Sequence, residues 1–171
     1  MQCLEGEQGI VFTVDGVRAF HGWTHACIDV VLDHLGLIPE SAYGSVVPGF
    51  GFGTLREQVV HLLNCEGLWV HLLRGAVYVD RRPEECVSVA DARAMQRRVR
   101  GETEAYLEAL TDEALNADAE LRFPDGDVAV RTPAKVLHHV LTHAFHHKGQ
   151  IVAMCRVLGY PAPDTDLSQI D

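Results

Sequence analysis

Residues 132–159 read TPAKVLHHVLTHAFHHKGQIVAMCRVLG, and this stretch is the strongest indicator of the fold. Thr132 is a suitable N-cap, and Pro133 follows at the first helical position, where its missing N–H costs nothing. Gly159 is a typical C-terminal stop. The apolar residues between these ends recur at helical spacing. The stretch therefore predicts one long helix over residues 133–158.

The upstream sequence predicts three further helices, over about residues 17–35, 54–74 and 89–110. The second of these has the clearest beginning. Thr54 and Glu57 have the spacing of a capping box, in which the hydroxyl and the carboxylate each bond a free backbone N–H.

The segment before the last helix differs from the rest of the chain. Residues 120–131 are typical of a small β-hairpin or loop excursion, with a turn at Pro124-Asp125-Gly126-Asp127. Residues 1–14 are expected to be an irregular lead-in. Four helices without a run of strands predict an all-α four-helix bundle that forms one domain over residues 1–171. The connections are long, so the sequence leaves open which neighbouring helices are antiparallel.

Composition excludes several classes of partner. The chain has 24 acidic and 14 basic residues, a net charge of −10, which argues against nucleic-acid binding. The arginines between Arg93 and Arg100 are interpreted as a solvated helix face. No apolar run approaches the roughly 18 residues of a membrane helix, and residues 1–9 lack the basic start of a secretory signal. We therefore expect no membrane partner.

The cysteines indicate a reducing compartment. There are five, an odd number, and no C-x-x-C pair occurs. Reduced thiols in the cytoplasm fit this pattern best. Cys27 and Cys155 are interpreted as core residues.

Histidines are the main candidates for function. There are ten, and five fall between His138 and His147. Positions four apart on a helix differ by only about 40° in direction, so His139, His143 and His147 form one row. Two imidazoles at this spacing can chelate one metal ion.

A pair of ligands needs a third from a facing helix, and the sequence offers several. His61 is the best candidate, with His71 and Cys65 as alternatives. His21 and His25 form a competing pair on the first helix. An H-x-x-x-H pair also arises often as hydrogen-bonded core histidines, so spacing alone leaves these interpretations open. A site of three histidines would keep a coordination position open, as catalytic sites do.

Three stretches resemble the DinB/YfiT-like family. They are FHGWTHACIDVVLDHL at 20–35, FGTLREQVVHLLNCEGLWVHLLRG at 52–75 and TPAKVLHHVLTHAFHHKGQIVAMCRVLGYPAPDTDL at 132–167. The last matches the family's H-x-x-x-H-x-x-x-H-[RK]-G-Q run. Two positions depart from the pattern: His25 replaces a different polar residue of many relatives, and Lys148 replaces a common arginine.

The resemblance implies a four-helix bundle with a three-histidine metal site. Carried over by position, the ligands are His61, His143 and His147. His139, one turn earlier on the same helix, would contact the ligands rather than the ion. The resemblance also implies that His21 and His25 line a pocket or lie on the surface.

The function implied by the resemblance is a metal-dependent hydrolase, or a transferase that uses a low-molecular-weight thiol, acting on a small-molecule substrate. Nickel or zinc is the expected ion, with iron or manganese as alternatives, and a homodimer is expected. The alternatives are a non-catalytic stress-response protein that binds a metal or small molecule, and a purely structural dimer. No catalytic base is assigned: Glu66 could be one or could form a salt bridge on the helix surface, and Gln150 could bond substrate or orient a ligand.

Overall fold

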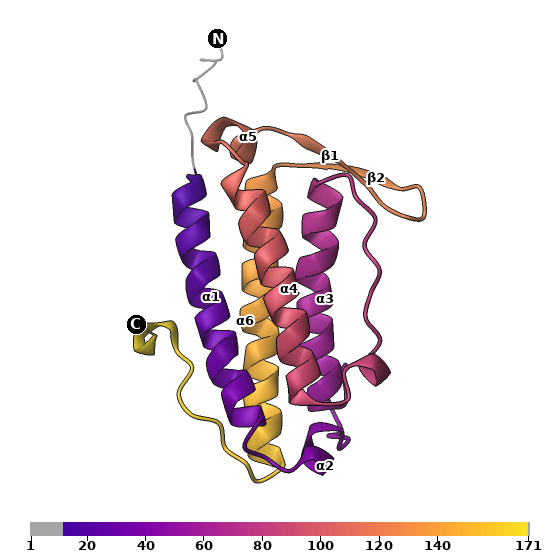
Figure 1. Cartoon of the computed structure of the whole chain (residues 1–171), viewed down its shortest axis with the longest axis vertical. Helices are drawn as coiled ribbons and strands as arrows, with labels where there is room; N and C mark the ends of the chain where they lie inside the picture. Colours follow the sequence, from indigo (N-terminus) through magenta and orange to yellow (C-terminus); the bar gives the residue numbers. More distant parts are fainter. Residues whose placement is uncertain (1–11, 171) are drawn as a thin grey trace, which may run out of the picture.

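Four long helices lie side by side in the computed structural model, which describes residues 12–170 (Figure 1). They are α1 (Val14–Leu35), α3 (Leu55–Leu73), α4 (Val89–Glu108) and α6 (Pro133–Val157). The expected all-α bundle is therefore confirmed. None of the helices in this described part combines the length and apolarity needed to cross a bilayer.

The helix directions, which the sequence left open, follow from the long connections. In the bundle α3 packs against α4 and α6, and α1 packs against the same two helices. Figure 1 shows α1 and α6 running in one direction, and α3 and α4 in the other. The neighbours α3 and α4 are parallel because residues 74–88 return along the length of the bundle.

One aromatic contact fixes this returning segment to α3. The Tyr78 hydroxyl donates to Asn64 Oδ1 at 3.0 Å, and the ring packs over Gly67. A Cβ atom at Gly67 would lie 2.4 Å from the Tyr78 ring, so only glycine admits this contact.

The helix ends show which signals were local. The Thr54–Glu57 capping box forms, with bonds of 3.0 and 2.9 Å. In contrast, α1 begins three residues earlier than expected. Thr13 caps it, and the Val14 N–H donates to the Asp112 carboxylate at 2.7 Å. Residues 1–11 of the expected lead-in lie outside the described residues.

Short elements connect the long helices. The expected hairpin is confirmed as two antiparallel strands in which Leu121 pairs with Ala129. Leu121 is buried, whereas Val128 and Val130 are about half exposed. The hairpin therefore packs on the bundle through its first strand. The short elements are α2 (Glu40–Tyr43), η1 (Pro83–Glu85), α5 (Asp112–Asn116), β1 (Ala119–Arg122), β2 (Val128–Arg131) and η2 (Leu167–Gln169).

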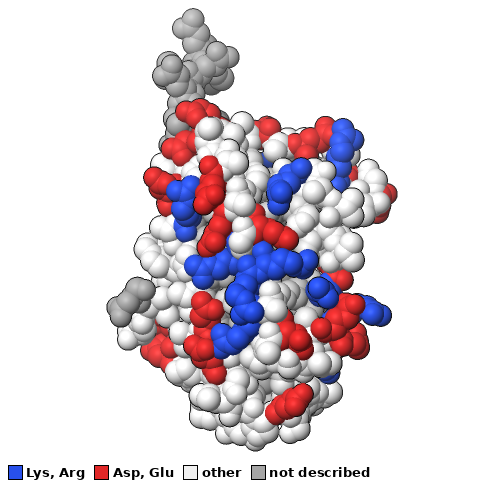
Figure 2. Space-filling view, in the orientation of Figure 1, with Lys and Arg blue, Asp and Glu red and all other residues white. Residues whose placement is uncertain are grey.

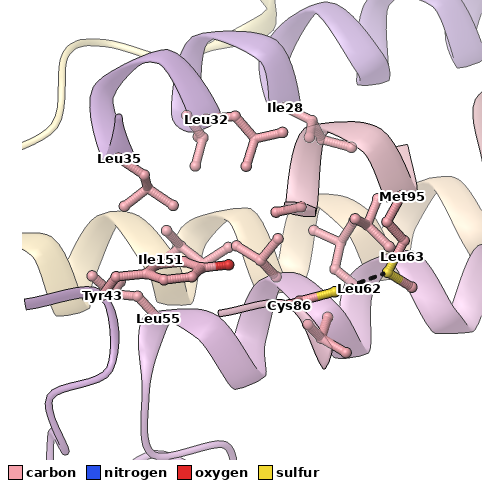
Figure 3. Close-up of a cluster of buried hydrophobic side chains, with 14 of the residues drawn as sticks. Ile28, Leu32, Leu35, Tyr43, Leu55, Leu62, Leu63, Cys86, Met95 and Ile151 are labelled. Carbon is pink, nitrogen blue, oxygen red and sulfur yellow. Dashed lines mark hydrogen bonds between the residues drawn. The ribbon is translucent and has the colours of Figure 1, made fainter. Parts of the chain in front are cut away.

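The largest hydrophobic cluster lies between the four long helices and includes Tyr43 of α2 (Figure 3). Cys27 and Cys155 are buried, as expected. Trp23 of α1, in contrast, is 48% exposed.

Basic side chains on the face that includes α4 alternate with acidic ones (Figure 2). Arg93 pairs with Asp33, and Arg100 pairs with Asp29 and Glu104. These pairs agree with a solvated helix face rather than a binding patch for nucleic acid.

Truncating the centre of the core should destabilise the bundle strongly. Leu63 is fully buried in the main cluster, and Leu63→Ala should lower the free energy of unfolding by about 2–5 kcal/mol in urea titrations. Leu37→Ala is the matched control, because Leu37 is 86% exposed; its effect should stay within about 0.5 kcal/mol. Equal effects of the two variants would contradict this account of the core.

Candidate metal centre

Three histidines from two helices converge on one point. His61 of α3 and His143 and His147 of α6 each offer a ring nitrogen, and these three atoms lie within 4.8 Å of one another. The Nε2 atoms of His61 and His143 are 3.2 Å apart. The structure thus brings together the three residues that the resemblance indicated as ligands.

Secondary structure and packing place these rings. His143 and His147 are one turn apart on α6, so both face α3. Buried residues of α6, including Ala144 and Ile151, join the core cluster that also contains the α3 side chains. His61 is stacked against Phe52, with ring centroids 4.0 Å apart, so the loop before α3 covers one side of the site.

A buried glutamine fixes the protonation of His147. Gln58 is fully buried, and its Nε2 donates to the Phe52 carbonyl at 3.0 Å. A carbonyl can only accept, so the amide orientation is determined. The Gln58 Oε1 must then accept from Nδ1–H of His147, at 2.7 Å. His147 therefore keeps its lone pair on Nε2, the atom available for a metal.

The chain of hydrogen bonds that begins at Gln58 continues to two further residues of α6, Gln150 and His146. Gln58 Nε2 also donates to Gln150 Oε1 at 2.7 Å. The Gln150 amide nitrogen then donates to Nε2 of His146 at 2.8 Å. Gln150 thus supports a ligand through Gln58, which is an indirect form of the orienting role considered from the sequence.

Burial keeps the three rings neutral. It lowers the pKa of His61, and together with the neighbouring imidazoles it lowers the pKa of His143 to about 4 and that of His147 to about 3. Neutral imidazoles are the form that binds metal ions, so the ligand set is deprotonated at neutral pH.

The donor set and its spacing fit a divalent transition ion. Tetrahedral ligands at about 2.0–2.1 Å from an ion lie about 3.3–3.4 Å apart, close to the 3.2 Å between His61 and His143. Within residues 12–170, no Cys, Asp or Glu joins the cluster. An ion held there would retain a coordination position that the described side chains do not fill.

The alternative third ligands do not reach this cluster. Cys65 lies outside the group of converging ligand atoms, and burial raises the pKa of its thiol to about 12. His71 donates from Nδ1 to the Gly67 carbonyl at 2.8 Å and packs against Tyr78.

An open pocket of about 220 Å³ lies near the triad and is lined by Trp69, Arg131, Lys135, Val136 and His139. The ring centroids of His139 and His143 are 5.7 Å apart. His139 does not support His143 as expected, because the buried Nδ1 of His143 has no hydrogen-bond partner among the described residues. His139 instead forms part of the pocket wall.

His21 and His25 form a second cluster, inside the bundle, with Glu66. They are 2% and 0% exposed, and Glu66 is 3% exposed. The expectation that the histidines line a pocket or lie on the surface is therefore wrong. Glu66 does not form a salt bridge on the helix surface either. Its carboxylate bonds both histidines, which occupy the oxygens that a general base would need.

Sequence reasoning missed three residues of these clusters: Gln58, Phe52 and Thr103. Gln58 left a signal, because it is a polar residue among apolar ones and lies one turn before His61. Phe52 acts through its backbone carbonyl and its ring, and Thr103 through a bond to a residue 37 positions away. Neither contact has a local pattern in the sequence.

Acidification should destabilise the metal-free protein. The pKa values of His143 and His147 are lowered from 6.5 on folding, so the unfolded chain binds more protons below pH 6.5. The free energy of unfolding should therefore fall between pH 6.5 and 4.5, before most carboxyl groups titrate. Urea unfolding at stepped pH measures this. A double variant with asparagine at both positions should show a shallower slope, and an unchanged slope would contradict the assignment.

The sequence matches the profile of the DinB family over residues 22–171. It is similar to Protein DinB of Bacillus subtilis (strain 168), with 22% identity over 153 residues that cover 80% of this chain and 82% of that protein. The crystal structure of a DinB family member from Shewanella denitrificans matches with a TM-score of 0.58 and 17% identity, covering 91% of this chain and 88% of that one. This structural similarity shows a shared fold.

Proposed function

We infer, from the premise that this chain belongs to the DinB family, that it binds one divalent metal ion through His61, His143 and His147. We further propose that the protein is an enzyme that depends on this ion, either a hydrolase or a transferase that uses a low-molecular-weight thiol. The observation that carries the proposal is the convergence of three neutral imidazole nitrogens from two helices.

The chemistry follows from the charge of the ligands. Three neutral ligands leave a divalent ion with its full charge, and such an ion favours the deprotonated form of a bound water or thiol. Both proposed reactions need this activation of a nucleophile. Imidazole ligands suit nickel and zinc, the ions we propose first, and also iron. Manganese is a weaker candidate because it prefers oxygen ligands.

The protein's own residues orient the ligands and bind the substrate. Gln58 holds His147 in the tautomer that directs Nε2 to the ion. The pocket beside His139 combines the ring of Trp69 with the cations Arg131 and Lys135. This lining suits a small molecule with an apolar body and a negatively charged group. A homodimer remains part of the proposal.

A second candidate is a non-catalytic metal-binding protein. One observation favours it: no carboxylate among residues 12–170 joins the three-histidine cluster, so the site lacks an evident general base. Turnover assays of the metal-loaded protein, with ester and amide substrates and with thiol acceptors, separate the two candidates. Activity that depends on the ion supports the enzyme.

His143→Ala should abolish tight metal binding and leave most of the helical structure intact. It removes one of the three ligands, whose ring centroids lie 4.3, 4.6 and 5.0 Å from one another. Elemental analysis and circular dichroism of the purified variant measure both effects. His138→Ala is the matched control on the same helix, because the His138 ring donates to the Ala134 carbonyl and does not belong to the three-histidine cluster. Metal content that is unchanged in His143→Ala would show that the ligand assignment is wrong.

Gln58→Leu should weaken metal binding about 10–100-fold, the usual cost of losing an orienting partner of a histidine ligand. The variant keeps the apolar volume but leaves Nδ1–H of His147 without its acceptor. Competition titration with a chromogenic chelator measures the affinity. Gln58→Glu retains an acceptor and should bind the ion more tightly than Gln58→Leu. The reverse order would contradict the orienting role.

A further inference from the structure

The second histidine cluster joins three helices deep inside the bundle. His21 and His25 are one turn apart on α1, and both direct Nε2 to the Glu66 carboxylate of α3. The His21–Oε1 distance is 2.8 Å, and His25 lies 3.2 and 3.1 Å from Oε1 and Oε2. Thr103 of α4 donates its hydroxyl to Oε1 at 2.7 Å.

This cluster needs a positive charge. Burial opposes ionisation of Glu66, but the two histidines outweigh it and lower the pKa of the carboxyl group, so the carboxylate is ionised. Within residues 12–170, the histidines are its only ion-pair partners, and no lysine or arginine reaches it. With both rings neutral, the cluster would hold an uncompensated buried anion, which is strongly unfavourable. Either an added proton or a metal ion can supply the charge.

We propose that His21, His25 and Glu66 form a second metal-binding site, which takes a divalent transition ion such as zinc or cobalt. Their three ligand atoms lie within 4.8 Å of one another. Two imidazoles and a carboxylate are a common ligand set for such ions. The 3.1–3.2 Å distances from His25 to the carboxylate are close to the roughly 3.3 Å expected around a tetrahedral ion. The His21 contact with Oε1, at 2.8 Å, would need to lengthen.

The surroundings of the cluster support an enclosed, structural ion. The bond from Thr103 orients the Glu66 carboxylate, as partners of metal ligands usually do. With an ion on Nε2 of His25, the proton of that ring lies on Nδ1, which has no partner in the structure. One unpaired N–H is a smaller penalty than an uncompensated carboxylate. The ion would cross-link α1 to α3 where solvent does not reach.

Counting bound ions in paired variants tests the proposal. Chelator-treated protein is titrated with Zn²⁺, bound metal is measured by elemental analysis, and the titration is repeated with Co²⁺ to record visible absorption. The full chain should bind two ions, Glu66→Gln one, His143→Ala one, and the double variant none. The Co²⁺ spectra of the two single variants should differ, because one site has a carboxylate ligand and the other has only imidazoles.

Each outcome bears on one site separately. If the full chain and Glu66→Gln bind equal numbers of ions, the second site is overturned and the cluster is held together by a proton. If Glu66→Gln binds fewer ions than the full chain but His143→Ala binds the same number, the second site is supported and the three-histidine proposal fails. Should Glu66→Gln not fold, as judged by circular dichroism, His21→Asn replaces it, and that variant should also bind one ion fewer than the full chain.

Discussion

The packing of α6 against α3 is the constraint on which the rest of the structure depends. These two helices provide all three residues of the candidate metal centre, and the buried amide of Gln58 lies between them. Because that amide bonds Phe52, Gln150 and His147 at once, it links the loop before α3, the helix interface and a ligand ring. A small change in how the helices meet would therefore alter the site as well as the core.

The two histidine clusters show that the surroundings of a histidine determine its role. His61 and His143 are half buried and lie beside other neutral rings. His21 and His25 have the same four-residue spacing as His143 and His147, but they face a carboxylate inside the bundle. Solvent reaches the first cluster at His61 and His143, whereas the second cluster is closed to solvent. Spacing along a helix thus specifies a pair of rings, and the facing helix specifies its chemistry.

Much of the fold could be predicted because its signals are local. Caps such as Thr54–Glu57 and the apolar periodicity of each segment place the helices within a few residues. The parallel arrangement of α3 and α4 could not be predicted, because it depends on the course of residues 74–88, and the contact of Tyr78 with Gly67 that fixes this segment forms only on folding. The early start of α1 combines the local cap Thr13 with a bond from Val14 to Asp112, which is 98 residues away. At the candidate site, helical spacing indicated the row of His139, His143 and His147. His61 was the best of several candidates for the third ligand, and the family resemblance selected it. The spacing of His21 and His25 was visible in the sequence, but their pairing with Glu66, 45 and 41 positions away, was not.

The distance along the chain between the triad's members has a consequence for the order of assembly. His61 and His143 are separated by 82 residues, so their nitrogens meet only after the intervening chain has been synthesised and α6 has docked. A nascent polypeptide that emerges from the ribosome up to α4 cannot form the triad. An ion captured there would bind only the assembled bundle, and by mass action it would favour that state over partly folded ones. Metal supply during translation would then influence how much of the chain reaches its native state.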